Sequence, residues 1–296
     1  MTATTIGILS PGDMGHSIAA RLRENGARVI TCLDGRSDRS RGLAAQAGME
    51  DVESLEAVVE QADVFLSVLV PARALDVAHQ VAAAIKATGA GILYVDCNAI
   101  APRTVQEVAR IVEAAGGRVA DAGIVGPPPR KPGTKFYASG PGAAEFAKLR
   151  EHGLDVRVLG PDIGQASGFK MCYGALTKGL TALGTELLVA AERMGLADQL
   201  RAEQEETMTA VLGWLRNSLP TMPPKAYRWV GEMEEIAQTF DDLGLTPRIL
   251  LGAADIYRFV ADTPIGHESP ETRDPNRGPD GVVAALAEAL PEPVNA

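Results

Sequence analysis

The chain has 296 residues, of which 46% are hydrophobic and 22% charged, a balance typical of a globular protein with a sizeable core. Its 38 Asp and Glu residues outnumber 28 Lys and Arg residues, and the net charge of -10 argues against a nucleic-acid or anionic-membrane surface. Aromatic residues make up only 4%, too few for the stacking platforms of single-strand or RNA binders.

Cysteine and histidine usage gives no sign of a metal site or a disulfide framework. Cys32, Cys97 and Cys172 are widely spaced, and no CxxC or HxxxH pair occurs. We therefore expect reduced thiols and no bound metal. No apolar run approaches the roughly 18 residues that suggest a membrane-spanning helix, and residues 1–10 lack the basic start of a signal peptide. These features predict a cytoplasmic protein.

The first half of the chain alternates short apolar runs with Ala-rich amphipathic stretches. This alternation predicts a doubly wound α/β domain, in which helices cover both faces of a parallel sheet. The expected strands are residues 5–9, 28–33, 64–70, 92–96, 118–122 and 135–139. The expected helices between and after them are residues 14–25, 39–47, 54–61, 72–86, 103–115 and 143–151.

The second half of the chain shows no strand pattern and is expected to be all-helical. Residues 164–194 are predicted to form one helix of roughly 30 residues, longer than a typical globular helix. Further helices are expected at residues 197–215, 224–240 and 247–260. Residues 266–281 are polar and rich in helix breakers, which indicates a loop before a short closing helix.

The strongest local signal is the segment TIGILSPGDMG at residues 5–15, where a strand runs into a tight turn and a helix follows directly. Such turns bind a nucleotide pyrophosphate, because glycine allows close backbone approach and free helix N–H groups face the anion. The dinucleotide fingerprint GxGxxG is matched at Gly12 and Gly15, whereas Ser10 replaces its first glycine. We expect the cofactor to contact Ser10, Pro11, Gly12, Asp13 and Met14.

Together these patterns predict a Rossmann-type dinucleotide-binding domain, with a doubly wound parallel sheet, at residues 1–161. An all-α domain for substrate binding and dimerisation is expected at residues 162–296, entered through the long interdomain helix.

The end of the second strand should decide between NAD and NADP. An acidic residue there binds the ribose hydroxyls of NAD, whereas an arginine accommodates the 2′-phosphate of NADP. The chain offers both Asp34 and Arg36, with further arginines close behind. We expect Arg36 and Ser37 to bind the cofactor, and NADP to be preferred over NAD. The alternative is an ordinary helix start with Ser37 or Asp38 as its N-cap.

The order of motifs along residues 5–195 resembles the β-hydroxyacid dehydrogenase superfamily, which includes 6-phosphogluconate, 3-hydroxyisobutyrate and tartronate semialdehyde dehydrogenases and the related imine reductases. The likeness lies in residues 7–15, 35–37, 62–71, 96–99 with Pro102, 121–126 and 164–170, followed by Glu186 and Gly195. The helical remainder, especially residues 223–233, resembles an uncharacterised C-terminal domain found in some bacterial members.

This resemblance implies a role for Lys170 as the catalytic acid/base. A lysine that faces the cleft can protonate a carbonyl oxygen or take the proton from a hydroxyl, and burial and the cationic nicotinamide would both lower its pKa. Taken alone, a single helix lysine is more simply a solvated surface charge. The resemblance also places Val70, Pro71 and Asn98 beside the nicotinamide and its ribose, and Gly123, Val125 and Gly126 in the substrate loop.

Three departures from the family pattern bear on the substrate. Val125-Gly126-Pro127 stands where the family usually carries Ser-Gly-Gly, and a valine cannot hydrogen-bond a carboxylate. The family's asparagine about one turn after the lysine is absent, and Asn98-Ala99 replaces its usual Ser-Thr. Tyr173, at i+3 from Lys170 on the same helix face, either supplies the missing donor or packs in the helix interface.

Two features of the helical half have both functional and structural interpretations. Arg228 would anchor an anionic substrate, although an i,i+4 pair with Glu232 is a simpler account. Four glycines in the long helix each cost roughly 1 kcal/mol against alanine. We expect these glycines to allow close packing of the helix against the nucleotide domain or a partner subunit, which fits a homodimer.

The sequence therefore predicts an NADP-preferring oxidoreductase that interconverts a hydroxyl and a carbonyl on a small, anionic, hydroxyacid-like molecule. The nearest alternative is a reductase of C=N bonds, because imine reductases share this architecture. An alternative of another class is an NADP-binding sensor or scaffold without turnover.

Overall fold

The computed structural model describes residues 4–130 and 133–291, which divide into two compact units. The first unit extends to Cys172 and the second begins at Tyr173. The division therefore lies inside the helix Gln165–Arg193, rather than before it at residue 161. The first turns of this helix belong to the sheet unit because a carboxylate of the sheet binds their backbone, as described below.

The first unit is built on one sheet with the strand order β3-β2-β1-β4-β5-β6-β7-β8. Strands β1 to β6 run parallel, as the alternating pattern predicts. The strands are β1 (Thr5–Leu9), β2 (Arg28–Thr31), β3 (Glu50–Asp51), β4 (Val64–Ser67), β5 (Leu93–Asp96), β6 (Arg118–Val125), β7 (Lys135–Ser139) and β8 (Asp155–Gly160).

The far edge of the sheet departs from the expected parallel arrangement. Strand β7 pairs antiparallel with β6, and β8 pairs parallel with β7. The connection from Val125 to Lys135 is too short for the crossover that a parallel neighbour requires, so the chain doubles back. Strands β3 and β8 were not expected, because β3 is two exposed acidic residues and β8 is an edge strand with little buried surface.

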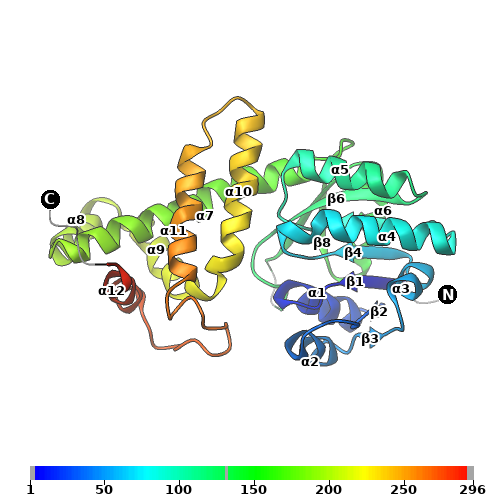
Figure 1. The fold of residues 1–296 in the computed structure, drawn as a ribbon, viewed down its shortest axis with the longest axis horizontal. Helices are drawn as coiled ribbons and strands as arrows, with labels where there is room; N and C mark the ends of the chain where they lie inside the picture. Colours follow the sequence, from blue (N-terminus) through cyan, green and yellow to red (C-terminus); the bar gives the residue numbers. More distant parts are fainter. Residues whose placement is uncertain (1–3, 131–132, 292–296) are drawn as a thin grey trace. The chain divides into compact units, whose positions relative to one another are not determined.

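Helices cover both faces of this sheet and build two apolar cores. One face carries α1 (Asp13–Glu24), α2 (Asp38–Gln46), α6 (Ala143–Phe146) and the 3-10 turn η2 (Ala147–His152). The other carries α3 (Leu55–Gln61), α4 (Ala74–Thr88), which follows the 3-10 turn η1 (Pro71–Arg73), and α5 (Pro102–Glu113) (Figure 1). Each fully buried Val, Leu or Ile side chain contributes about 1.5–3 kcal/mol, so these faces hold the sheet rigid.

The second unit is helical, as expected. It contains α7 (Gln165–Arg193) from Tyr173 onward, then α8 (Ala197–Thr207), α9 (Thr209–Ser218), η3 (Leu219–Thr221), η4 (Pro223–Lys225), α10 (Ala226–Asp242), α11 (Arg248–Ala261) and α12 (Pro279–Ala289). The predicted helix at residues 197–215 is two helices that break at Met208, where no Gly or Pro marks the break.

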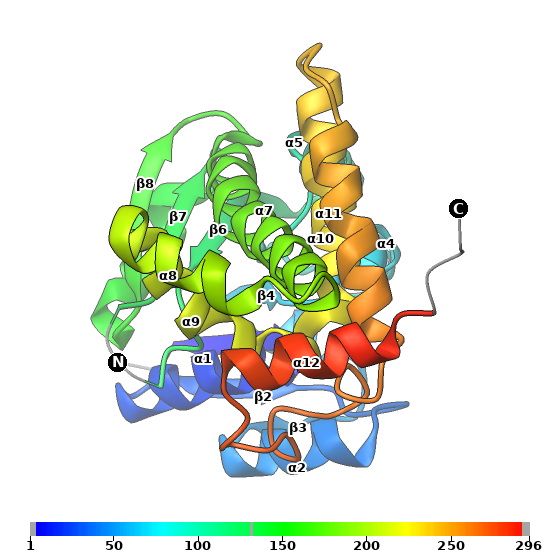
Figure 2. The same ribbon diagram turned by 90° about the vertical axis from the view of Figure 1, so that its left-hand side faces the viewer.

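Helices α10 and α11 lie side by side (Figures 1 and 2) and are joined to α7 through Tyr257. The buried Tyr257 hydroxyl donates to the carbonyl of Lys178 at 2.6 Å, and its ring packs edge-on against Trp229. A Cβ on Gly184 would lie 2.2 Å from Leu215 of α9, so this glycine serves close packing within the unit itself. No helix of residues 4–130 and 133–291 is long and apolar enough to cross a membrane.

Candidate active site

The predicted cofactor and substrate segments follow neighbouring strands at one edge of the sheet. Strands β1, β4, β5 and β6 are adjacent and parallel, so their carboxyl ends meet at that edge. The glycine turn follows β1, Val70 and Pro71 follow β4, Asn98 follows β5, and Val125 ends β6. Ligands of open α/β sheets bind at this edge, and the sheet order therefore brings these segments together.

The glycine turn after β1 has the geometry that a pyrophosphate requires. Gly12 is the N-cap of α1, and no side chain caps the helix, so its first N–H groups face outward. A Cβ on Gly15 would lie 2.0 Å from the carbonyl oxygen of Ser10, so only glycine lets the helix approach the turn this closely. A Cβ on Gly12 would meet nothing within 4 Å, which leaves open space beside the backbone. The turn fits a dinucleotide.

Arg36 is the arginine best placed for a 2′-phosphate at the end of β2. Its side chain is half-buried, and burial and the nearby charge of Arg73 both lower its pKa. Among the described residues no carboxylate pairs with Arg36, whereas Asp34 is exposed. Arg73 ends η1, after β4, and also lies 3.4 Å from Asp76. Two neighbouring guanidinium groups in an acidic protein attract an anion.

The other polar residues after β2 are occupied within the protein. Ser37 is the N-cap of α2 and accepts a hydrogen bond from the backbone N–H of Ser40 at 3.3 Å. The alternative interpretation of Ser37 as an N-cap is therefore confirmed, and a contact of Ser37 with a cofactor would be additional to this role. Arg39 pairs with Asp13 at 2.6 Å, and Arg41 donates to the carbonyl of Arg36 at 3.2 Å.

Asn98 is buried, and its side chain links the ends of β4 and β5. Its amide nitrogen donates to Asp96 at 2.9 Å and to Ser67 at 3.0 Å, and its amide oxygen accepts from the backbone N–H of Leu69 at 2.5 Å. The backbone N–H of Asn98 also donates to Asp96. Because both ends of the amide are occupied, Asn98 fixes the backbone that leads to Val70 and Pro71.

Asp121, a buried residue in the middle of β6, caps the start of α7. Its carboxylate accepts from the backbone N–H groups of Gly164 and Ser167 at 2.9 and 3.0 Å. The hydroxyls of Ser167 and Ser139 donate to it at 2.7 and 3.2 Å. These bonds satisfy helix donors that are otherwise unpaired, and they fix the helix on which Lys170 follows Ser167 by one turn.

Lys170 lies directly against Gly123 of β6. A Cβ on Gly123 would be 2.8 Å from the carbonyl oxygen of Ala166 and 3.0 Å from the Cβ of Lys170. Glycine is therefore required for α7 to pack on β6 at this distance. The half-buried Lys170 thus stands beside the first residue of the predicted substrate loop.

Asp96 adds a buried carboxyl group near Lys170. Burial raises its pKa to about 7, with a further increase from the charge of Asp121, whereas Asn98 and Lys170 oppose the shift. A carboxyl group that titrates near neutral pH next to a lysine is a feature of acid–base sites. Asp96, Asp121 and Arg73 were absent from the predicted site; a carboxylate inside an apolar strand was the available signal for the first two.

Two predicted substrate residues, Tyr173 and Arg228, belong to the second unit. Tyr173 is 47% exposed on α7. Glu232, the residue expected to pair with Arg228, forms an ion pair with Lys178 at 3.0 Å. Arg228 Nε is buried and has no hydrogen-bond partner within the described parts of the chain.

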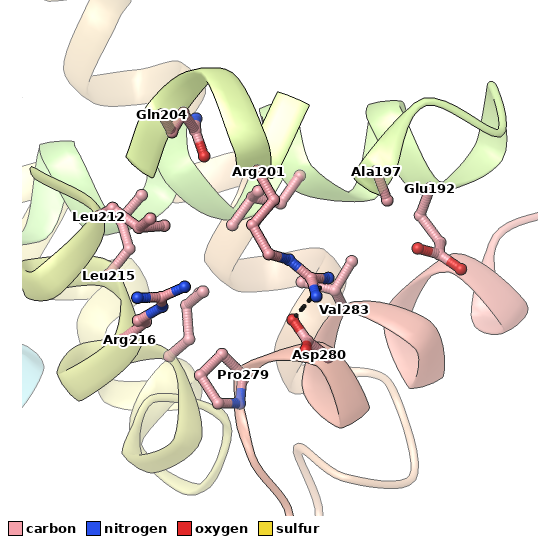
Figure 3. Close-up of a pocket in the computed structure, with 12 residues that line it drawn as sticks. Glu192, Ala197, Arg201, Gln204, Leu212, Leu215, Arg216, Pro279, Asp280 and Val283 are labelled. Carbon is pink, nitrogen blue, oxygen red and sulfur yellow. Dashed lines mark ion pairs between the residues drawn. The ribbon is translucent and has the colours of Figure 1, made fainter. Parts of the chain in front are cut away.

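The second unit also contains a cavity of about 260 Å³ between α7, α8, α9 and α12 (Figure 3). Its arginines are paired: Arg201 with Asp280 at 3.1 Å, and Arg216 with Glu205. The amide oxygen of Gln204 is buried in its lining, and none of the described residues donates to it. The lining residues include two carboxylates, Glu192 and Asp280, but no histidine, cysteine, lysine or tyrosine. The described residues contain no cluster of potential metal ligands either.

Two family models match the chain. The NAD-binding domain of 6-phosphogluconate dehydrogenase matches residues 5–151, and a domain of unknown function, DUF1932, matches residues 191–260. The first match contains the sheet and the glycine turn, and the second lies within the helical unit.

Solved structures extend the similarity over both units. The chain is 30% identical to the conserved protein MTH1747, whose description reports structural similarity with 3-hydroxyacid dehydrogenases, over 87% of this chain and 97% of the other, with a TM-score of 0.66. It is 20% identical to a 3-hydroxyisobutyrate dehydrogenase of Mycobacterium tuberculosis with L-serine, over 97% and 99%, with a TM-score of 0.69. An imine reductase of Streptomyces aurantiacus is 18% identical over 98% and 100%, with a TM-score of 0.55. The last two show a shared fold.

Proposed function

The chain belongs to the β-hydroxyacid dehydrogenase superfamily of NAD(P)-dependent oxidoreductases, and from that membership we propose that it interconverts a hydroxyl and a carbonyl on a small, anionic, hydroxyacid-like substrate. The observation that carries this proposal is the seating of Lys170 against Gly123, beside the buried Asp96. The glycine turn that fits a dinucleotide opens at the same edge of the sheet.

Lys170 is the residue we assign to proton transfer. In reduction its ammonium group donates a proton to the carbonyl oxygen, and in oxidation its amine accepts the proton of the hydroxyl. NADP, when bound, takes or supplies the hydride. Ionised Asp96 and the ammonium group attract each other, and Asp121 holds the helix that presents Lys170.

The cofactor contacts fall into two groups in this proposal. Ser10, Pro11, Gly12, Asp13 and Met14 hold the pyrophosphate, and Val70 and Pro71 flank the nicotinamide. Asn98 supports that contact by holding the backbone of the segment, since its own amide is occupied. Arg36, with Ser37 at the start of α2, binds the 2′-phosphate. Its charge lies near that of Arg73, and no carboxylate of the described residues pairs with it, which favours NADP over NAD.

The substrate contacts in this proposal are Gly123 and Val125 at the end of β6 and Gly126 directly after it, and Tyr173 and Arg228 are further candidates. Val125 offers no side-chain hydrogen bond, so an anionic substrate needs another partner. Arg228 supports this role because its buried Nε lacks a hydrogen-bond partner among the described residues.

Reduction of C=N bonds is the second candidate activity. The apolar Val125 in place of a hydroxyl favours a substrate without a carboxylate, whereas the retained Lys170 favours carbonyl chemistry. A cofactor-binding sensor without turnover is the third candidate.

The three candidates are distinguished by assaying the purified protein with NADPH and NADH against separate pools of hydroxyacids, carbonyl acids, aldehydes and imines. Turnover of a hydroxyacid–carbonyl pair that Lys170→Met abolishes supports the proposal; turnover of imines only, or tight NADPH binding without turnover, contradicts it.

A homodimer is supported by an apolar stripe on α7. Tyr173, Leu176, Leu180, Leu183 and Leu187 recur along α7 at spacings of three or four residues, and Met194 directly follows its last residue. Leu176, Leu183 and Met194 are 70%, 57% and 64% exposed. Such a pattern is typical of the seam between paired helices. Leu183→Glu is expected to give a monomer in light scattering, whereas Leu243→Glu, on a turn where the side chain is 70% exposed, is not. A monomeric unmodified protein would contradict the dimer.

A further inference from the structure

The connection between β6 and β7 reaches across to the first turns of α1 through Arg130. Arg130 Nη2 lies 2.6 Å from His16 Nε2, and Arg130 Nε donates to the hydroxyl oxygen of Ser17 at 3.2 Å. These contacts join residues more than a hundred positions apart. The same connection begins at Val125 and Gly126, the predicted substrate loop.

The hydrogen bonds at this contact have defined directions. His16 Nδ1 lies 2.8 Å from the carbonyl oxygen of Gly12, which can only accept, so Nδ1 carries the proton and Nε2 accepts from Arg130. The hydroxyl of Ser17 donates to the carbonyl oxygen of Asp13 at 2.8 Å, so its lone pair is free to accept from Arg130. Arg130 is thus linked, through two buried neutral groups, to the turn that fits the pyrophosphate.

The electrostatics of this position are unfavourable without an anion. The N-terminus of a helix carries a partial positive charge, and a cation placed there is destabilising. Within residues 4–130 and 133–291 no carboxylate pairs with Arg130, and the nearby carboxylate of Asp13 is paired with Arg39. The guanidinium group of Arg130 is therefore hydrogen-bonded to neutral acceptors and lies beside the positive end of a helix. A doubly charged anionic ligand would be stabilised by both positive charges.

We propose that Arg130 binds the pyrophosphate of the dinucleotide and so joins the substrate loop to the bound cofactor. The inference rests on the NAD(P) site of the first unit and not on the identity of the substrate. Arg130 then adds a charge-assisted hydrogen bond to those from the N–H groups of α1.

The test measures cofactor affinity in the absence of any substrate. Binding of NADPH, and of adenosine 2′,5′-bisphosphate, which has only one phosphate of the pyrophosphate, is titrated for the unmodified protein, Arg130→Met and Arg130→Lys. We expect Arg130→Met to weaken NADPH at least tenfold and the bisphosphate clearly less, with partial recovery in Arg130→Lys. Arg110→Met, which removes an exposed arginine of α5 paired only along its own helix, should change neither.

Four results would overturn the proposal. NADPH affinity of Arg130→Met within twofold of the unmodified protein would show that Arg130 does not touch the cofactor. Equal weakening of both ligands, or the same loss in Arg110→Met, would indicate a general effect of charge. A change confined to the KM of the substrate would assign Arg130 to a substrate anion. Failure of the unmodified protein to bind either NADPH or NADH would remove the cofactor site itself.

Discussion

Asp96 and Asp121 are register partners on the adjacent parallel strands β5 and β6, and both carboxylates are buried at the edge where the site lies. Asp121 accepts hydrogen bonds from the start of α7, and Asp96 is bonded to Asn98. Their mutual repulsion contributes to the raised pKa of Asp96, and the charge of Lys170 opposes it. Asp96 and Asp121 thus link the surroundings of Lys170 to Asn98 on one side and to the start of α7 on the other.

Asp121→Asn should loosen the start of α7. The new NH₂ group faces donors that the carboxylate accepted, which leaves buried groups unpaired. We expect the free energy of unfolding to fall by about 2–4 kcal/mol, and kcat to fall by more than KM rises. Denaturant unfolding of Ser139→Ala, which removes one donor to Asp121 and the acceptor of the Ala166 N–H, should show a smaller loss of about 1–2 kcal/mol. An unchanged free energy of unfolding in Asp121→Asn would contradict the role of Asp121 as the cap of α7.

The titration of Asp96 should appear in the pH dependence of stability. Its pKa is raised from 3.8 to about 7 in the folded protein, so the folded state holds a proton that the unfolded state has lost between these values. This contribution is full below pH 4 and is lost as pH rises through 7. Its upper limit is about 4 kcal/mol. Asp96→Asn should flatten the fall in unfolding free energy between pH 4 and pH 7, and an unchanged slope would refute the assignment.

Gly123→Ala should displace Lys170 without unfolding the protein. The added methyl would meet the backbone of Ala166 and the Cβ of Lys170, so α7 must shift. We expect a stability loss of about 1–3 kcal/mol and a fall in kcat of about tenfold or more, since small misplacements of reacting groups are costly. Gly91→Ala, whose methyl meets nothing within 4 Å, is the matched control. Equal kinetics in both variants would argue against the contact.

Arg36→Met and Arg73→Met should each weaken the binding of NADPH more than that of NADH. Each removes one of the neighbouring guanidinium groups, and we expect NADPH binding to weaken about tenfold or more while NADH binding changes less than twofold. Fluorescence titration of both dinucleotides measures this selectivity, with NADH as the internal control. Parallel losses for NADPH and NADH would place these arginines outside the 2′-phosphate site.

The sequence predicted the parts of the fold that have local periodicity. The strands β1, β2, β4, β5 and β7 and the long helix α7 follow from apolar runs and their breakers, and the glycine turn from its spacing. The short acidic β3 and the exposed edge strand β8 bury too little apolar surface to produce a pattern. The reversal at β7 depends on loop length and tertiary pairing rather than on residue type.

The site residues that belong to local sequence motifs could be predicted. Contacts between residues far apart in the sequence could not. Lys170 and Gly123 belong to recognisable motifs, but their contact exists only once α7 packs on β6. The cap of α7 by Asp121 and the contact of Arg130 with His16 join residues far apart in the chain. No local pattern encodes such pairs, because the partners are chosen by the order of the strands.

The rate of hydride transfer in a single turnover tests the central role of Lys170 most directly. NADPH-loaded protein is mixed with the carbonyl substrate found by the screen, and NADPH absorbance is followed for the unmodified protein, Lys170→Met and the exposed control Lys86→Met. The account predicts a loss of about 100-fold or more in Lys170→Met alone, with NADPH affinity within twofold of the unmodified protein. An undiminished rate in Lys170→Met would contradict it.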